Sequence, residues 1–435
     1  MSLVFTKEGL YAMAAVLSNG DMKFDLYSAS VGHPDWRDTN RRADRMVKEV
    51  SRVLEFDSRT FAERASEVRR VAGGLSTFAR SLFTNHARLK KGDHTLLPPY
   101  FILTMLNKCN FRCTYCDNHA YKGYYDLPEI KDIGLEQSKE ILRIIGKNVS
   151  AIYFCGGEPT LHKDLPELAE YAASISYFPI MINTNGSRFH DILKDPRYSR
   201  LLKNLDIIII SLDALNLDRL SSVWGVKKAL GEQVIVNILA LRRLQEKVRF
   251  KLMVNTVITP ETIDEADAIL DWTNDLGIWY SPVPMNRGPH IHEDLKSKPD
   301  YHALCDKIIT RKNQGYKILG SRRLVENLVK GKSIKCFPSL IPHVDGDGYT
   351  YWPCKTASAL EPIKLNVLDF ESWDDLYQAA EKVISVKDIH GKGPGRCGGD
   401  CQWMQNYVSD ALARGVAHPL RSGALLEITE FVGAV

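Results

Sequence analysis

Three closely spaced cysteines constrain this 435-residue chain more than any other feature. The run Cys109-Asn-Phe-Arg-Cys113-Thr-Tyr-Cys116 has the spacing Cys-x3-Cys-x2-Cys and follows an apolar segment, Tyr100–Leu106. Three thiolates at this spacing can hold three irons of a four-iron, four-sulfur cube and leave the fourth iron open to a substrate. A closed structural site would need a fourth ligand. Alone, the run also allows a zinc site that lacks one ligand, or a chance cluster in a chain with 9 Cys.

A second motif follows further along the chain, where the apolar stretch Ala151–Cys155 runs directly into Gly156-Gly157-Glu158-Pro159. Two glycines at the end of a strand leave backbone groups bare for the close approach of a ligand. A glutamate beside them can accept a hydrogen bond from an ammonium group. By itself this segment is an ordinary turn. In this order and spacing, the two motifs together resemble the radical S-adenosylmethionine (SAM) superfamily.

The resemblance implies a role for each residue of the two motifs. The three cysteines of the first run match the cluster ligands, and Tyr115 occupies the aromatic position that lies near the adenine of SAM. Gly156, Gly157 and Glu158 match the segment that binds the methionine amino group. In the family, SAM chelates the free iron and is cleaved by one electron from the reduced cluster. The resulting 5′-deoxyadenosyl radical abstracts hydrogen from the substrate, while the protein positions and shields the reactants.

From Tyr100 onward, strand-like runs rich in Ile and Val alternate with segments of helical length and periodicity. The predicted strands are Tyr100–Leu106, Ala151–Cys155, Ile180–Asn185, Asp206–Leu212, Arg249–Ile258 and Ile278–Pro284, and the predicted helices include Leu135–Lys147, Asp164–Ile175, Val234–Glu246 and Ile263–Leu276. This pattern predicts an α/β fold, a parallel sheet covered by helices. Six such units make a partial (β/α)6 TIM-like barrel, which is the fold that the resemblance implies.

Polar residues end several of the predicted strands, where the working residues of a parallel barrel lie. Asn185 belongs to a Thr-Asn-Gly turn after the third strand, Ser211 and Asp213 end the fourth, and Asn255 lies late in the fifth. The resemblance implies that these four residues contact SAM. The alternative is a purely structural role, since Asn, Ser and Asp commonly end strands.

Four further cysteines lie beyond the predicted barrel, and they can close an all-cysteine metal site. They are Cys336, Cys354, Cys397 and Cys401. The first two bracket a predicted hairpin with Gly346 and Gly348 in its turn. By ligand type alone the site suits zinc or iron–sulfur. Because it follows such a barrel, the site resembles the auxiliary-cluster extensions called SPASM and twitch. The presence of four cysteines rather than seven favours the twitch type, which has one additional cluster.

This extension departs from the family pattern in detail. Gly348 precedes Cys354 by one residue more than usual, and the last pair has the spacing Cys-x3-Cys. If all four thiolates bind, no iron is open to substrate, which favours electron transfer. The two remaining cysteines, Cys155 and Cys305, are predicted to be structural.

Three regions follow from these motifs: a mainly helical N-terminal region (1–95), the barrel (96–300) and the auxiliary-cluster region (301–435). Two helices are expected near the N-terminus, at Arg41–Val53 and Arg59–Phe83, and they could cap the barrel, dimerise or hold a substrate. A module that grips a leader peptide is not expected, because only Met22–Tyr27 offers a strand there.

Composition predicts a cytoplasmic protein. No apolar run is long enough to span a membrane, and the N-terminus lacks the pattern of a signal peptide. Nine cysteines in a reducing compartment favour metal ligation over disulfides. A net charge of +4 is a weak bias, so neither a nucleic acid nor a membrane is expected as a partner.

The sequence predicts an enzyme with two 4Fe–4S clusters and SAM, acting on a small polar substrate such as a sugar or nucleoside, with flavodoxin or ferredoxin as reductant. Two alternatives stay open: maturation of a ribosomally made peptide, and a non-catalytic iron–sulfur or zinc protein. No general acid or base is assigned, since Tyr280, Lys355 and Asp400 have equally ordinary interpretations as packing or solvated residues.

Overall fold

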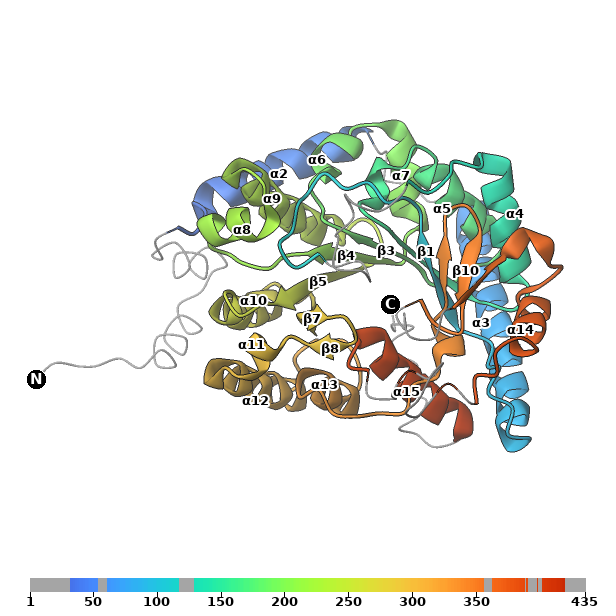
Figure 1. Cartoon of the computed structure of the whole chain (residues 1–435). Coiled ribbons are helices and arrows are strands. Elements are labelled where there is room, and N and C mark those ends of the chain that lie inside the picture. Colours follow the sequence, from blue (N-terminus) through green and yellow to red (C-terminus); the bar gives the residue numbers. More distant parts are fainter. Residues whose placement is uncertain are drawn as a thin grey trace, which may run out of the picture.

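The computed structural model describes residues 32–53, 61–116, 129–355, 362–387, 389, 397 and 401–418. Its centre is a nine-stranded sheet in the order β11-β10-β9-β1-β2-β3-β4-β5-β6. Strands β1 to β6 are all parallel and neighbour one another in chain order, and among the described residues the pairing does not close the sheet into a barrel (Figure 1). They are β1 (Tyr100–Thr104), β2 (Ala151–Cys155), β3 (Ile180–Thr184), β4 (Ile207–Ser211), β5 (Lys251–Ile258) and β6 (Trp279–Pro284).

Helices that follow the strands form an outer layer on one face of this sheet (Figure 1). They are α4 (Leu135–Gly146), α5 (Leu165–Ser174), α6 (Phe189–Ile192), α7 (Pro196–Asn204), α8 (Leu217–Trp224), α9 (Lys228–Leu244) and α10 (Ile263–Asp275). All six predicted strands and the four predicted barrel helices are confirmed, most within two residues at each end. The exception is α9, which begins six residues before the predicted Val234 because Lys228–Gly231 belongs to its first turn.

Successive strand residues alternate between the outer helices and the inner face of the sheet. Outward residues such as Phe101, Phe154 and Ile182 enter the main core with the helices. Inward residues form two levels. The lower level is apolar, and Ile102, Tyr153, Met181, Ile209 and Met253 line a cavity of about 110 Å³ there. The upper level lies two residues further along each strand, towards the carboxyl ends, and it is polar.

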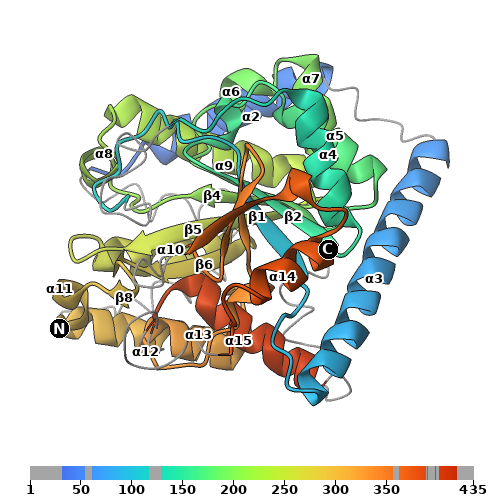
Figure 2. The same ribbon diagram turned by 45° about the vertical axis from the view of Figure 1, so that its right-hand side comes forward.

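Two N-terminal helices attach to the outside and to the lower end of the sheet. Helix α2 (Trp36–Val53) packs on α9, and the ring of Trp36 lies 6.1 Å from that of Trp272 on α10. Helix α3 (Phe61–Lys90) runs past the amino ends of the strands (Figure 2). Arg70 of α3 forms a buried two-bond ion pair with Asp206, the residue just before β4.

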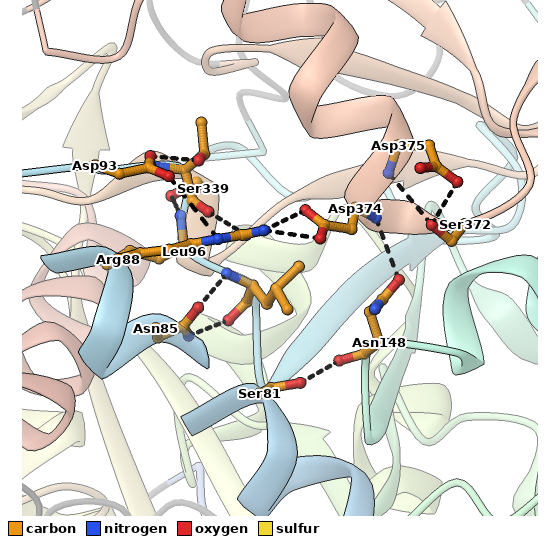
Figure 3. A network of polar contacts seen from close by, with 12 residues as sticks. Ser81, Asn85, Arg88, Asp93, Leu96, Asn148, Ser339, Ser372, Asp374 and Asp375 are labelled. Carbon is orange, nitrogen blue, oxygen red and sulfur yellow. Dashed lines mark hydrogen bonds and ion pairs between the residues drawn. The ribbon is translucent and has the colours of Figure 1, made fainter. Parts of the chain in front are cut away.

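The second half of α3 continues along the same end of the sheet (Figure 3). Ser81 donates to the carbonyl of Asn148, and the Asn85 side chain bonds both backbone groups of Leu97, just before β1. Arg88 donates two bonds of 2.7 Å to Asp374 in the C-terminal region. Helix α3 therefore joins the barrel to the extension that follows it.

The C-terminal extension continues the sheet instead of forming a separate layer. Strand β9 (His343–Asp345) pairs in parallel with β1, and β10 (Tyr349–Trp352) and β11 (Ile363–Asn366) add antiparallel strands. The predicted hairpin between Cys336 and Cys354 is thereby confirmed. The remaining elements here are β7 (Asn286–Arg287), β8 (His290–Ile291), α11 (Glu293–Lys296), α12 (Pro299–Asn313), α13 (Arg322–Val329), α14 (Trp373–Glu381) and α15 (Met404–Ala417).

Helix α15 covers the inner face of the open sheet. Its residues Met404, Val408 and Leu412 line the apolar cavity opposite the lower-level strand residues. The sequence did not predict this helix. Its apolar residues contact the sheet on one side and helices α3 and α13 on the other, so they do not form a single apolar stripe. In the part of the chain that is described, no helix combines the length and apolar character needed to cross a membrane.

Candidate active site

The loop that carries the first three cysteines is held against the C-terminal end of α8. The amides of Arg112 and Thr114 donate to the carbonyls of Trp224 and Val223, both at 2.9 Å. The rings of Phe111 and Trp224 lie 5.0 Å apart. These contacts fix the backbone on either side of Cys113, so the three thiols are presented from an ordered loop.

The glycine pair after β2 lets the same loop approach the strand end. A Cβ atom on Gly157 would lie 2.0 Å from the carbonyl oxygen of Lys108, and one on Gly156 would lie 2.6 Å from that of Leu106. The amide of Gly157 donates to the Leu106 carbonyl at 2.7 Å. The expectation that these glycines leave their backbone groups bare is therefore wrong for the amide of Gly157, which donates to the segment that leads into the cysteine loop.

Glu158 is enclosed beneath this junction with an exposed fraction of 0%. Its carboxylate accepts from the hydroxyls of Thr160 and Thr184, and from the amides of Thr160 and Asn185. Burial raises the pKa of Glu158, although these donors oppose the shift. The side chain ties β2 to the end of β3 and does not line the cavity described below.

Asp213 has the corresponding position behind the cysteine loop, also with an exposed fraction of 0%. Its carboxylate accepts from the hydroxyl of Tyr115 and the indole N–H of Trp224, both at 2.5 Å, and from the amide of Val257 at 2.8 Å. Burial raises its pKa to about 6. Neither Asp213 nor Glu158 lines the cavity, so their geometry favours positioning of neighbours over direct contact with a ligand.

A cavity of about 440 Å³ lies at the carboxyl ends of β3, β4 and β5, beside the three thiols. Most of the residues that line it are ones that the sequence analysis proposed as cluster ligands or SAM contacts: Cys109, Cys113, Tyr115, Cys116, Gly156, Gly157, Asn185, Ser211 and Asn255. Asn183 was not proposed as a ligand contact, yet it also lines the cavity, and its buried Oδ1 has no hydrogen-bond partner among the described residues. Its period-2 spacing from inward-facing Met181 is the signal that could have identified it.

The surroundings of Cys109 and Cys113 favour the protonated thiols. Burial raises the pKa of Cys109 and Cys113, and the nearby Glu158 and Asp213 carboxylates raise these two values further. The side-chain amide of Asn185 opposes the effect with a contact of 3.9 Å to Cys109 Sγ. A positively charged iron cluster would favour the thiolates and release their protons, as metal binding to cysteine generally does.

The four C-terminal cysteines converge on a second position. The thiols of Cys354, Cys397 and Cys401 are all close enough to raise the pKa of Cys336, after the larger effect of burial. The side-chain amide of Asn406, on α15, donates to Cys401 Sγ at 2.6 Å. Ser409, one turn later, accepts from the amide of Phe337, next to Cys336. The first two turns of α15 thus contact two of the three cysteine-bearing segments.

Within the described residues, no three His, Cys, Asp or Glu side chains are close enough to share one metal ion. An all-cysteine donor set suits either a structural zinc ion or an iron–sulfur cluster. A four-iron cube distributes its cysteines over separate irons, and the donor set is all sulfur, which suits such a cluster.

Comparison with known proteins agrees with this arrangement. The family model "Radical SAM superfamily" matches residues 103–273. An S-adenosylmethionine-dependent nucleotide dehydratase from Selenomonas ruminantium is 30% identical over 205 residues, covering 45% of this chain and 69% of that protein. A GTP 3',8-cyclase from Helicobacter pylori is 26% identical over 252 residues, covering 57% of this chain and 73% of that protein.

Solved structures share the fold at low identity. SuiB of Streptococcus suis bound to the precursor peptide SuiA aligns with a TM-score of 0.50 and 17% identity over 69% of either chain. Native anSMEcpe with bound AdoMet aligns with a TM-score of 0.50 and 16% identity, over 78% of this chain and 100% of that chain. The cysteine run, the parallel sheet and the sequence relatives agree. This chain belongs to the radical SAM superfamily of enzymes, whose members use a 4Fe–4S cluster and S-adenosylmethionine.

Proposed function

We propose that Cys109, Cys113 and Cys116 hold the 4Fe–4S cluster and that SAM occupies the adjoining cavity of about 440 Å³. The observation that carries the proposal is that the three thiols, the glycine pair and three polar strand ends share one cavity. Its volume lies within the range of small-molecule sites, about 300 to 1,000 Å³. When bound, the cluster and SAM supply a carbon radical that abstracts hydrogen from an unactivated position.

The protein's own residues then bind and orient SAM. The Oδ1 atom of Asn183 is available to accept from a ligand hydroxyl or amino group, and Ser211 and Asn255 offer polar groups on the next two strands. Tyr115 offers its ring to the adenine. In this assignment Asp213 fixes Tyr115, and Glu158 fixes the start of the Asn185 turn. Both carboxylates are therefore positioning residues.

We propose a second 4Fe–4S cluster on Cys336, Cys354, Cys397 and Cys401. The convergence of the four thiols and the Asn406 bond to Cys401 support it. Four protein ligands would leave no iron open to substrate, so this cluster exchanges electrons with the substrate after hydrogen abstraction. Flavodoxin or ferredoxin supplies the electron for the first cluster, and a reducing, cytoplasmic location suits nine free cysteines.

The proposed substrate is a small hydroxylated molecule of the nucleoside or nucleotide type. Two relatives that match the barrel carry names of nucleotide-converting enzymes, and this supports the class. The second candidate is a peptide substrate, which has the likeness to SuiB in its favour. That likeness concerns the fold, so the nucleotide class has the stronger support.

The test compares the two cysteine sets after anaerobic reconstitution. We expect about eight irons per chain in the wild type. Replacing Cys397 and Cys401 by Ala should remove about half of the iron, keep dithionite-driven formation of 5′-deoxyadenosine, and abolish product formation. Replacing Cys109, Cys113 and Cys116 by Ala should abolish both activities. Circular dichroism of each variant checks that the fold is intact, since a metal site can contribute folding energy.

Two results would contradict the proposal. A wild-type protein that holds four irons per chain, with zinc in the second site, would show that there is no second cluster. Wild-type product formation by a folded Cys397→Ala/Cys401→Ala protein would make the second site structural rather than electron-transferring.

A further inference from the structure

A polar group that the proposed SAM site does not use lies at the edge of the same inner face. Asp345 ends β9, and its carboxylate accepts from Lys355 Nζ at 2.7 Å and from the Tyr351 hydroxyl at 2.9 Å. The side chains of Lys355 and Asp345 are only 14% and 12% exposed. We call Asp345, Tyr351 and Lys355 the edge triad.

Strand register places Asp345 of the edge triad on the upper, polar level of the inner face. Asp345 pairs with Thr104 of β1, and Thr104 pairs with Cys155 of β2. Thr104 Oγ1 lies 4.0 Å from Cys155 Sγ, so these two side chains share a face. The next strand contributes Asn183, which follows the paired residues Phe154 and Ile182 by one position, as Cys155 does. Asp345, Thr104, Cys155 and Asn183 therefore form one row.

The row sets the distance between the edge triad and the proposed SAM site. Three strand spacings separate Asp345 from Asn183, or about 14 Å along the sheet. Lys355 also follows Cys354 directly in the chain, so the edge triad adjoins a ligand of the proposed second cluster.

The bonding of the edge triad differs from that of an ion pair that only joins elements. At the lower end of the sheet, Arg70 donates to both oxygens of Asp206 and to the carbonyl of Tyr177, and Asp206 also accepts from the amide of Ile180. In contrast, the Lys355 ammonium can donate three hydrogen bonds, and among the described residues it donates one, to Asp345. Its charge also acts on the inward thiol of Cys155.

Charge decides which ligand suits this group. The positive charge of Lys355 is balanced by Asp345 at 2.7 Å, so the pair does not present a net charge to an anion. It does present an ammonium donor and a carboxylate acceptor side by side. A pair of neighbouring hydroxyl groups, each able to donate and accept, matches that arrangement.

We propose that the edge triad is the substrate-recognition site of this enzyme and binds vicinal hydroxyl groups of a sugar or ribose, with Lys355 donating to one oxygen and Asp345 accepting from the other. This inference rests on the proposed function and adds a residue-level account of substrate choice. Tyr351 holds the carboxylate and supports the ammonium, which lies 5.0 Å from its ring centre.

The experiment measures binding of GTP, 2′-deoxy-GTP and 3′-deoxy-GTP to the anaerobically reconstituted protein by calorimetry, with saturating SAM and no reductant. Bound SAM keeps the probes out of its own pocket. We expect the wild type to prefer GTP over each deoxy analogue by about tenfold to a hundredfold, the value of a hydrogen bond to a charged group. Lys355→Met should lose this preference.

The matched control is Lys364→Met. Lys364 lies at a similar distance, 5.1 Å, from the same Tyr351 ring, but it is exposed on β11. It should keep the preference. Because Lys355→Met leaves Asp345 without its cation, the double variant Lys355→Met/Asp345→Asn removes both charges and guards against misfolding.

Two outcomes would overturn the inference. A folded double variant that still distinguishes GTP from its deoxy analogues would make the edge triad a structural ion pair. A wild type that binds none of the three probes, or binds them equally, would rule out ribose recognition at this site. Either result would leave dithionite-driven SAM cleavage unaffected, so failure of this inference is distinguishable from failure of the proposed radical SAM chemistry.

Discussion

Single side chains behind the active-site wall decide how the cavity is shaped. Asp213 shows this most clearly, because it holds Tyr115, Trp224 and the amide of Val257 with one enclosed carboxylate. The sequence identified the position, since Asp213 follows the end of β4. It did not reveal the burial, which depends on Trp224 arriving from α8.

Asp213→Asn should change how stability depends on pH. Burial raises the pKa of Asp213 from 3.8 to about 6, so the native state binds this proton more tightly than the unfolded chain. The contribution of Asp213 to the free energy of unfolding of the wild type therefore falls as the pH rises from about 4 to about 6, by up to about 3 kcal/mol, and is constant above that window. The amide cannot ionise, so Asp213→Asn lacks this contribution.

Urea unfolding of the cluster-free, reduced protein at pH 4.5 and 7 measures the effect. The difference between wild type and Asp213→Asn should shift in favour of the variant at the higher pH. The control is Asp300→Asn, whose carboxylate is exposed near the start of α12. Parallel pH profiles for wild type and Asp213→Asn would contradict the account.

At the scale of elements, the strand ends and the cysteine loop depend on each other. The loop that follows β1 rests on the glycine pair of β2 and on the end of α8. The strands themselves were predictable, because unbroken runs such as Ile207–Ile210 are typical of strands buried on both faces. The docking partner of the cysteine loop was not predictable, because Trp224 and Gly225 lie more than a hundred residues away in sequence and carry no local signal.

Gly157→Ala should displace the cysteine loop, because its Cβ would lie 2.0 Å from the Lys108 carbonyl and backbone cannot move aside easily. We expect the variant to lose about 1 to 3 kcal/mol of stability. In a Cys397→Ala/Cys401→Ala background, where only the first cluster is counted, its iron content should fall well below four per chain.

Gly146→Ala is the matched control for that substitution. Its Cβ would meet the Tyr177 ring at an ordinary 3.4 Å, so iron content and stability should stay near those of the parent. Full iron loading in Gly157→Ala would show that the loop accommodates a side chain there.

For the whole molecule, helix α3 acts as a tie between the barrel and the C-terminal extension. Figure 3 shows Arg88 reaching Asp374, while Asn85 and Ser81 hold the segments that enter β1 and β2. The sequence predicted a helix here and allowed it to cap the barrel. Its amphipathic pattern could not identify the surfaces it joins, which come from distant parts of the chain.

Arg88→Met should destabilise the protein by about 1 to 2 kcal/mol, since the ion pair is partly exposed and carries two bonds. A double-mutant cycle with Asp374→Asn should give a coupling energy of about 1 kcal/mol. The control is Arg143→Met, which removes an equally close but exposed pair with Glu140 on α4. Its effect should stay within about 0.5 kcal/mol, and equal effects for Arg88 and Arg143 would argue against a tie.

The pairing of β9 with β1 has a consequence for dissecting the enzyme. Residues 343–345 complete the hydrogen bonding of the first barrel strand, although they follow it by more than two hundred positions. A fragment that stops near residue 300 would leave β1 as an open edge with unpaired N–H and C=O groups, the usual starting point for strand exchange and fibrillar association between chains. A fragment that ends there is therefore unsuited to separate expression.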